Sequence, residues 1–77
     1  MLRLEIERKK RRWTQADVAR RCEALLGSDS RLRLQTIISR AELEQLRLTD
    51  AELDVLADVF NVHPAFLLLR HVEGVLP

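Results

Sequence analysis

Hydrophobic residues recur along this 77-residue chain at the spacing of helices, and the pattern divides it into five predicted helices. A hydrophobic side that returns every three or four residues indicates a helix, whereas strict alternation indicates a strand. Leu2, Leu4 and Ile6 do alternate, but the Glu, Lys and Arg residues around them favour a first helix over about residues 3–11. The other helices are expected over about residues 14–26, 35–44, 49–61 and 64–72.

Capping signals support several of these boundaries. A threonine followed three residues later by an acid, with hydrophobic residues on either side, forms a capping box and a hydrophobic staple. Gly27 and Asn61 tolerate the left-handed backbone that ends a helix, and Pro64 suits a first helical position. Two helix starts have both features: one consists of Trp13, Thr14, Asp17 and Val18, and the other of Leu48, Thr49, Glu52 and Leu53.

The predicted core is aliphatic, because aromatic residues make up only 4% of the chain. Two glycines and two prolines are too few for a turn-rich β fold, so composition also favours an all-α class. A chain of this length forms one small domain with a barely sufficient core, which dimerisation would help to stabilise. Expected core residues are Val18, Cys22, Leu25 and Leu26, then Leu34, Ile38 and Ala41, then Leu53, Leu56, Ala57 and Phe60.

The third predicted helix carries an unusual outer side. Gln35, Thr36, Ser39 and Arg40 lie together opposite Ile38 at helical spacing. A glutamine amide can bond an adenine edge, an arginine fork matches guanine, and hydroxyls and methyls suit thymine. A short polar helix can also carry such residues by chance, so this segment alone is a weak indication of DNA reading.

Charge is divided unevenly along the chain. Residues 1–40 carry 11 lysines and arginines against five acids, whereas residues 41–77 carry two against seven. The densest basic run, residues 8–12, can contact phosphates without reading sequence, or it can be a solvated helix end. Such polarity suits a basic face presented to a polyanion, and chance segregation on a solvated surface is the competing interpretation.

Several functional classes are not expected. One cysteine, Cys22, cannot form an internal disulfide, and no hydrophobic run approaches the roughly 20 residues of a membrane span. We therefore expect a cytoplasmic protein without a signal peptide. His63 and His71 have no accompanying cysteine or carboxylate arrangement, so no enzyme activity, metal, cofactor or small-molecule substrate is expected.

The run Trp13-Thr-Gln-Ala-Asp-Val-Ala-Arg20, followed by Ile38-Ser-Arg-Ala-Glu42 and Leu48-Thr-Asp-Ala-Glu-Leu-Asp-Val-Leu-Ala-Asp-Val-Phe-Asn-Val62, resembles the Cro/C1-type (XRE-like) helix-turn-helix family. The resemblance covers roughly residues 4–69. It implies one compact five-helix, lambda-repressor-like domain over residues 1–77. In that domain, residues 1–12 form a basic first helix, residues 14–44 the helix-turn-helix, residues 48–72 supporting helices and residues 73–77 an apolar tail.

The resemblance also implies a function. We expect a sequence-specific DNA-binding transcriptional regulator, a phage-type or bacterial repressor, that inserts its third helix into the major groove of double-stranded DNA. By position, Gln15 matches a glutamine that touches phosphate and sometimes a base. Gln35, Thr36 and Arg40 match base-reading positions, with Ser39 beside them, and Arg47 matches a phosphate contact after the helix.

The connection between the second and third helices departs from the family pattern. It runs for eight residues, from Gly27 to Leu34, whereas a helix-turn-helix turn has three or four. We expect a loop and then an extended segment over residues 31–34, with Arg31 and Arg33 following the phosphates as a basic arm. The extra length can equally change the angle between the helices. The helix start is also poorly marked, because Leu34 is a weak cap and Ser30 offers an earlier start.

A second functional class stays open. A protein-interaction module on the same scaffold would bind a repressor, a polymerase subunit or a toxin without specific DNA binding. The apolar C-terminal segment also predicts a homodimer, whose DNA half-sites would lie about 34 Å apart or a multiple of it. The expected dimer contact consists of Phe66, Leu69, Val72, Val75 and Leu76.

Overall fold

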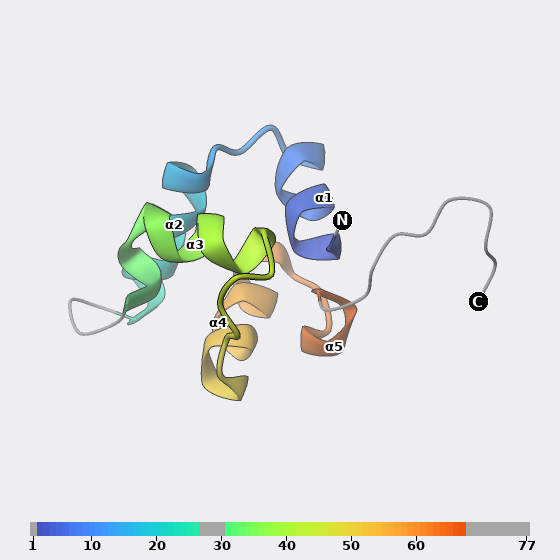
Figure 1. The fold of residues 1–77 in the computed structure, drawn as a ribbon. Coiled ribbons are helices and arrows are strands. Elements are labelled where there is room, and N and C mark those ends of the chain that lie inside the picture. Colours follow the sequence, from blue (N-terminus) through green and yellow to red (C-terminus); the bar gives the residue numbers. More distant parts are fainter. Residues whose placement is uncertain (1, 27–30, 68–77) are drawn as a thin grey trace, which may run out of the picture.

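The computed structural model describes residues 2–26 and 31–67, which form an all-α fold with five α-helices (Figure 1). The predicted fold class is therefore confirmed. No strand occurs within these residues, and no helix among them is long and apolar enough to cross a membrane. The elements are α1 (Arg3–Lys10), α2 (Gln15–Leu26), the 3-10 helix η1 (Arg31–Arg33), α3 (Gln35–Glu42), α4 (Asp50–Phe60) and α5 (Pro64–Leu67).

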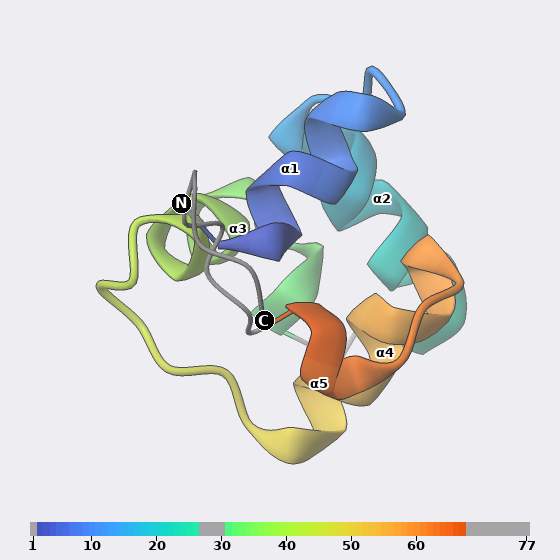
Figure 2. The same ribbon diagram turned by 90° about the vertical axis from the view of Figure 1, so that its right-hand side faces the viewer.

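Helix α3 packs with one side against α2 and η1. α2 packs against α3, η1 and α4, while α5 contacts both α4 and α1. Figure 2 shows α1 on one side of the molecule and the pair α4 and α5 on the other, with the connection over residues 43–49 running around the outside. Helix α3 therefore keeps one side toward the core and the other toward solvent.

Both predicted capping boxes are present. Thr14 Oγ1 accepts from the Asp17 N–H at 3.0 Å, and Asp17 Oδ2 accepts from the Thr14 N–H at 2.8 Å. The Thr14 N–H that donates to the Asp17 carboxylate is the main cause of a lowered pKa of Asp17, and the Thr14 side chain lowers this pKa further. Thr49 and Glu52 form the same reciprocal pair at the start of α4. The starts of α2 and α4 are thus fixed by local hydrogen bonds that the sequence encodes.

Three helix ends within the described residues, those of α1, α3 and α4, have a residue other than glycine in the left-handed conformation. Arg12, Glu44 and Asn61 have φ angles of 59°, 60° and 57°, in the left-handed region. After α3, Glu44 N–H donates to Ala41 O and Gln45 N–H to Arg40 O, the two bonds of a Schellman motif. Asn61 ends α4 as predicted, whereas α3 ends at Glu42, earlier than expected. Gly27 and the predicted end of the last helix lie outside the described residues.

The core joins all of the helices. Val18, Cys22, Leu32, Ile38 and Leu56 are fully buried, and Trp13 stacks on Phe60 at the edge of this cluster with ring centroids 5.4 Å apart. Burial raises the pKa of the Cys22 thiol to about 11. The predicted core residues Ile38, Ala41, Leu53, Leu56, Ala57 and Phe60 are all buried.

Three predictions about the second and third helices are wrong. The segment predicted to be extended is the 3-10 helix η1, whose Leu32 is fully buried. Leu34 is 51% exposed, because it precedes α3 with an extended backbone and Leu32 fills the core instead. Leu25 and Leu26 are also exposed, since they lie in the last turn of α2, past the positions that pack into the core.

Candidate nucleic-acid interface

The outer side of α3 is polar and accessible. Gln35, Thr36 and Arg40 are exposed and Ser39 is half-buried, while Ile38 and Ala41 lie buried on the opposite side. At 3.6 residues per turn, the four polar positions cover roughly 140° of the helix circumference. The structure therefore brings these four predicted residues together on one face, here called the α3 face.

A buried ion pair holds the end of α3 against α1. Arg8 Nε lies 2.6 Å from Glu42 Oε2, and Arg8 Nη2 donates to Glu42 Oε1 at 3.0 Å. The two side chains are only 11% and 3% exposed. The hydrogen bonds to Glu42 raise the pKa of Arg8, and Arg8 Nη1 also donates to the Trp13 carbonyl at 2.9 Å. One guanidinium thus joins α1, the turn before α2 and the last residue of α3.

Gln15 joins the same network. Its Nε2 donates to Glu42 Oε1 at 3.1 Å, and the side chain is half-buried. The side-chain amide that the family resemblance assigned to a phosphate or base contact is therefore already hydrogen-bonded within the molecule. Because Gln15 is the first residue of α2 and Glu42 the last of α3, this hydrogen bond fixes the start of one helix against the end of the other.

Arg31, Arg33 and Arg47 occupy different environments. Arg31 forms an ion pair with Glu52 in the capping box of α4, and that hydrogen bond lowers the pKa of Glu52 to about 2. Arg33 is exposed, and its side chain forms no hydrogen bond or ion pair with another residue in the ranges 2–26 and 31–67. Arg47 is exposed and lines a hollow beside α4. Of these three, Arg33 is the one whose side chain is ready to meet a phosphate near the start of α3.

The basic run over residues 8–12 divides into inward and outward side chains. Arg8 forms an ion pair with Glu42. Arg11 forms an ion pair with Glu7 at 2.8 Å and donates a hydrogen bond to the Phe60 carbonyl at 2.7 Å. Lys9 forms an exposed pair with Glu5. A polyanion would therefore meet fewer cations here than the sequence suggested, because two of the arginines hold α1 to the rest of the molecule.

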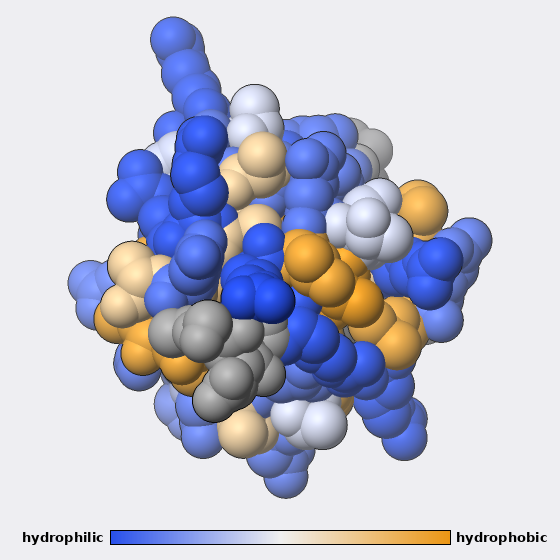
Figure 3. All heavy atoms as spheres, turned by 90° about the vertical axis from the view of Figure 1, so that its left-hand side faces the viewer, coloured by the Kyte–Doolittle hydropathy of each residue, from blue (hydrophilic) through white to orange (hydrophobic). Residues whose placement is uncertain are grey.

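Hydrophobic side chains are also exposed near α3. Leu34 and Leu43, which flank α3 at its two ends, are 51% and 64% exposed. Figure 3 shows one side of the molecule, turned by 90° from Figure 1: its surface is mostly hydrophilic and is interrupted by hydrophobic patches. The ends of α3 thus carry exposed hydrophobic side chains next to the polar α3 face.

Sequence reasoning missed the partnership of Arg8 with Glu42. Nothing in the local spacing links residues 34 positions apart, and Arg8 was interpreted as part of a phosphate-contacting run. One signal was available, because Glu42 follows Ile38 by four residues and so falls on the inward side of α3. An acid on a core-facing side needs a buried partner, and an arginine is the usual one.

The chemistry available on the α3 face is that of hydrogen bonding. It offers an amide, two hydroxyls and a guanidinium on a helix whose position is fixed by the Arg8, Glu42 and Gln15 network. No group of three or more metal-ligating side chains occurs within the described residues. Comparison with protein-family models, curated proteins and solved structures finds no match to this chain.

Proposed function

We propose that this protein is a sequence-specific DNA-binding regulator of the Cro/C1-type helix-turn-helix kind, which inserts α3 into the major groove. The observation that carries the proposal is the α3 face: Gln35, Thr36 and Arg40 are exposed and form no ion pair within the described residues. These side-chain types match the donors and acceptors of base edges. The buried core side of α3 and its tie to α1 provide the rigid support that base reading needs.

Phosphate contacts would orient the helix on the duplex. Arg33 lies just before α3, and Gln15 begins α2, whose first-turn N–H groups favour an anion. Arg31 is a weaker candidate for a phosphate contact than the predicted basic arm implied, because Glu52 already balances its charge. Arg47 would have to turn outward from the hollow that it lines.

The first test is selection of bound duplexes from a random DNA pool, followed by titration of the selected sequences at several salt concentrations. The proposal expects an enriched motif bound with an affinity that falls as salt rises. Salt-dependent binding without a motif would leave a DNA-binding protein that does not read sequence. Absence of binding at low salt would overturn the proposal.

Replacing Arg40 tests the proposed base contact directly. Arg40→Ala should cost about 1–3 kcal/mol of binding free energy on the selected sequence and relax discrimination at one base step, because a bidentate fork is lost. Arg20→Ala is a matched control, since Arg20 is exposed on α2 and pairs with Asp17. An equal loss for Arg40→Ala on every DNA sequence would remove Arg40 from base reading.

A protein-interaction module is the second candidate function. It is favoured by one observation: Leu34 and Leu43 are more than half exposed at the two ends of the α3 face. Exposed leucines on a small domain suit a protein surface better than a groove lined by phosphates. Substituting both leucines with serine would weaken binding to a protein partner, whereas DNA discrimination at the Arg40 base step would persist.

A further inference from the structure

A hollow of about 430 Å³ opens between α1, α4, α5 and the connection that follows α3. Its wall is largely aliphatic and includes Leu2, Leu4, Leu46, Leu53 and Leu67. Volumes of roughly 300–1,000 Å³ with mostly apolar walls and a few polar groups are typical of occupied sites in proteins.

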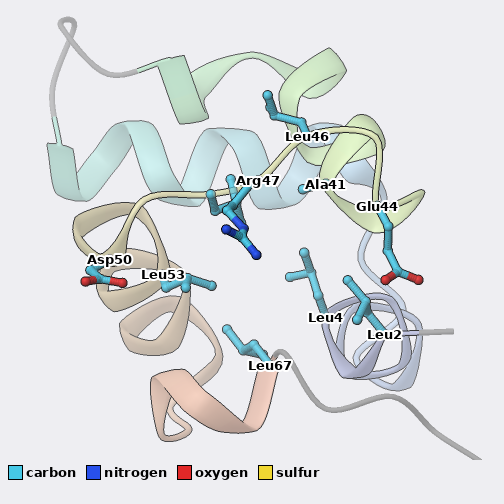
Figure 4. Close-up of a pocket in the computed structure, with 10 residues that line it drawn as sticks. Leu2, Leu4, Ala41, Glu44, Leu46, Arg47, Asp50, Leu53 and Leu67 are labelled. Atoms are coloured by element: carbon cyan, nitrogen blue, oxygen red, sulfur yellow. The ribbon is translucent and has the colours of Figure 1, made fainter.

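One cation points into this apolar space. Figure 4 shows the Arg47 guanidinium directed between Leu4, Leu53 and Leu67. Glu44 and Asp50 also belong to the wall, but in the same view their carboxylates lie toward its edges. Among residues 2–26 and 31–67, none accepts a hydrogen bond from the Arg47 side chain, and the Arg47 carbonyl accepts one from Arg31. The hollow therefore combines aliphatic walls with a guanidinium that can take an acidic partner.

We propose that residues 68–77 of the same chain fold back and fill this hollow. Leu67, a wall residue, is followed directly by ten residues that include Leu68, Leu69, Val72, Val75 and Leu76. Glu73 is the single acid among them and is the partner whose charge complements Arg47. Six residues span up to about 20 Å, so Glu73 lies within reach of a site that begins at Leu67.

Physical reasons favour the same chain over a second copy. A segment tethered to the wall of its own site has an effective concentration in the millimolar range, far above that of another molecule. Closing so short a loop also costs little chain entropy. The segment cannot fill this hollow and form the predicted homodimer contact with the same side chains, so the two arrangements are alternatives. The docking does not depend on DNA binding.

A spin label at residue 74 tests the proposal. Gly74→Cys adds a thiol that can be labelled selectively, because the native Cys22 is fully buried and has a pKa raised to about 11. We expect the nitroxide to broaden the NMR signals of Leu4, Leu46 and Leu53, and chemical reduction of the label should restore them. Absence of broadening would overturn the proposal.

Isotope mixing separates the two arrangements. Spin-labelled protein without isotope is mixed with isotope-labelled protein without a spin label, so that only contacts between copies broaden signals. The proposal expects no broadening of the hollow residues in the mixture. Broadening there would show that a second copy supplies the segment, which would overturn docking within one chain and support the homodimer.

Charge substitutions test which side chains occupy the hollow. Val72→Asp with Val75→Asp in the spin-labelled chain should abolish the broadening, because each introduces a charge into an aliphatic space. His71→Asp adds a charge at a polar position of the same segment and should leave most of the broadening intact. Equal effects of the two changes would overturn apolar docking. Arg47→Gln should reduce the broadening without abolishing it.

Discussion

At the scale of single residues, Glu42 connects the end of α3 to both α1 and α2. Its two carboxylate oxygens accept from Arg8 and Gln15, and its side chain is only 3% exposed. A buried carboxylate is tolerable only while it is paired and hydrogen-bonded. Glu42 and Arg8 therefore act as one unit, and removing either leaves the other charge uncompensated.

Glu42→Gln should destabilise the protein by about 3 kcal/mol, because it leaves the Arg8 guanidinium buried without an opposite charge. Chemical denaturation at neutral pH measures the free energy of unfolding. Glu5→Gln is the matched control, since the pair of Glu5 with Lys9 is exposed and contributes about 0.5 kcal/mol or less. Losses of similar size for the two variants would contradict the importance assigned to the buried pair.

The ion pair of Glu52 with Arg31 predicts a pH dependence of stability. The pKa of Glu52 falls from its ordinary value of 4.5 to about 2, so its stabilising contribution is complete above about pH 4.5 and is lost as pH falls toward 2. Glu52→Gln should lower the free energy of unfolding at pH 7 by about 1 kcal/mol, a figure reduced for solvent screening.

The difference between wild type and Glu52→Gln should shrink between pH 4.5 and pH 2. Thermal denaturation across this range measures it, with Asp54→Asn as a control on the exposed side of the same helix. A difference that stays constant over the range would show that Glu52 acts through its shape rather than its charge.

At the scale of elements, the helix ends are the most unusual feature. Arg12 and Glu44 adopt left-handed backbone angles that usually favour glycine. The hydrogen bonds that follow α1, from Arg12 N–H to Lys9 O and from Trp13 N–H to Arg8 O, require this conformation. The chain therefore accepts local strain to turn sharply from α1 into α2.

Arg12→Gly should stabilise the protein by about 1 kcal/mol, because glycine adopts the left-handed region without the side-chain penalty. Lys10→Gly should destabilise it by about 1 kcal/mol, because position 10 lies within α1. The same substitution at two positions, two residues apart, should therefore change the free energy of unfolding in opposite directions. Chemical denaturation of both variants measures this free energy. Destabilisation by Arg12→Gly would mean that its side chain holds the turn.

The elements also show what could be predicted from the sequence. The starts of α2 and α4 follow from the threonine-acid boxes, whose hydrogen bonds are local and so appear directly in the residue order. The 3-10 helix η1 has no such signal, because it is held by the burial of Leu32 among residues distant in sequence. The four residues of the α3 face follow from helical spacing, but the partners of Arg8, Gln15 and Arg31 are set by tertiary packing.

At the scale of the whole molecule, the polarity of charge along the sequence is partly cancelled in space. Arg8 pairs with Glu42 and Arg31 pairs with Glu52, and each pair joins the basic half of the chain to the acidic half. The cations left for a polyanion are therefore fewer than the count along the sequence implies. Affinity for DNA should depend on those unpaired side chains.

The salt dependence of DNA binding is the slope of log affinity against log salt concentration. Arg33→Gln should reduce the magnitude of this slope by about 1, because one phosphate contact is lost. Arg31→Gln should change the slope clearly less, since Glu52 already balances that charge. Titrations of both variants on the selected duplex measure the slopes. An unchanged slope for Arg33→Gln would place Arg33 outside the interface.

Because Cys22 is buried, the reactivity of its thiol reports how often the core of the protein opens. A thiol with no solvent exposure reacts with an alkylating reagent only when the helices around it separate. Because it is the single cysteine of the chain, its alkylation rate divided by that of a free thiol gives the fraction of open molecules without any added probe. DNA that binds only the folded state should slow this chemistry in proportion to its affinity.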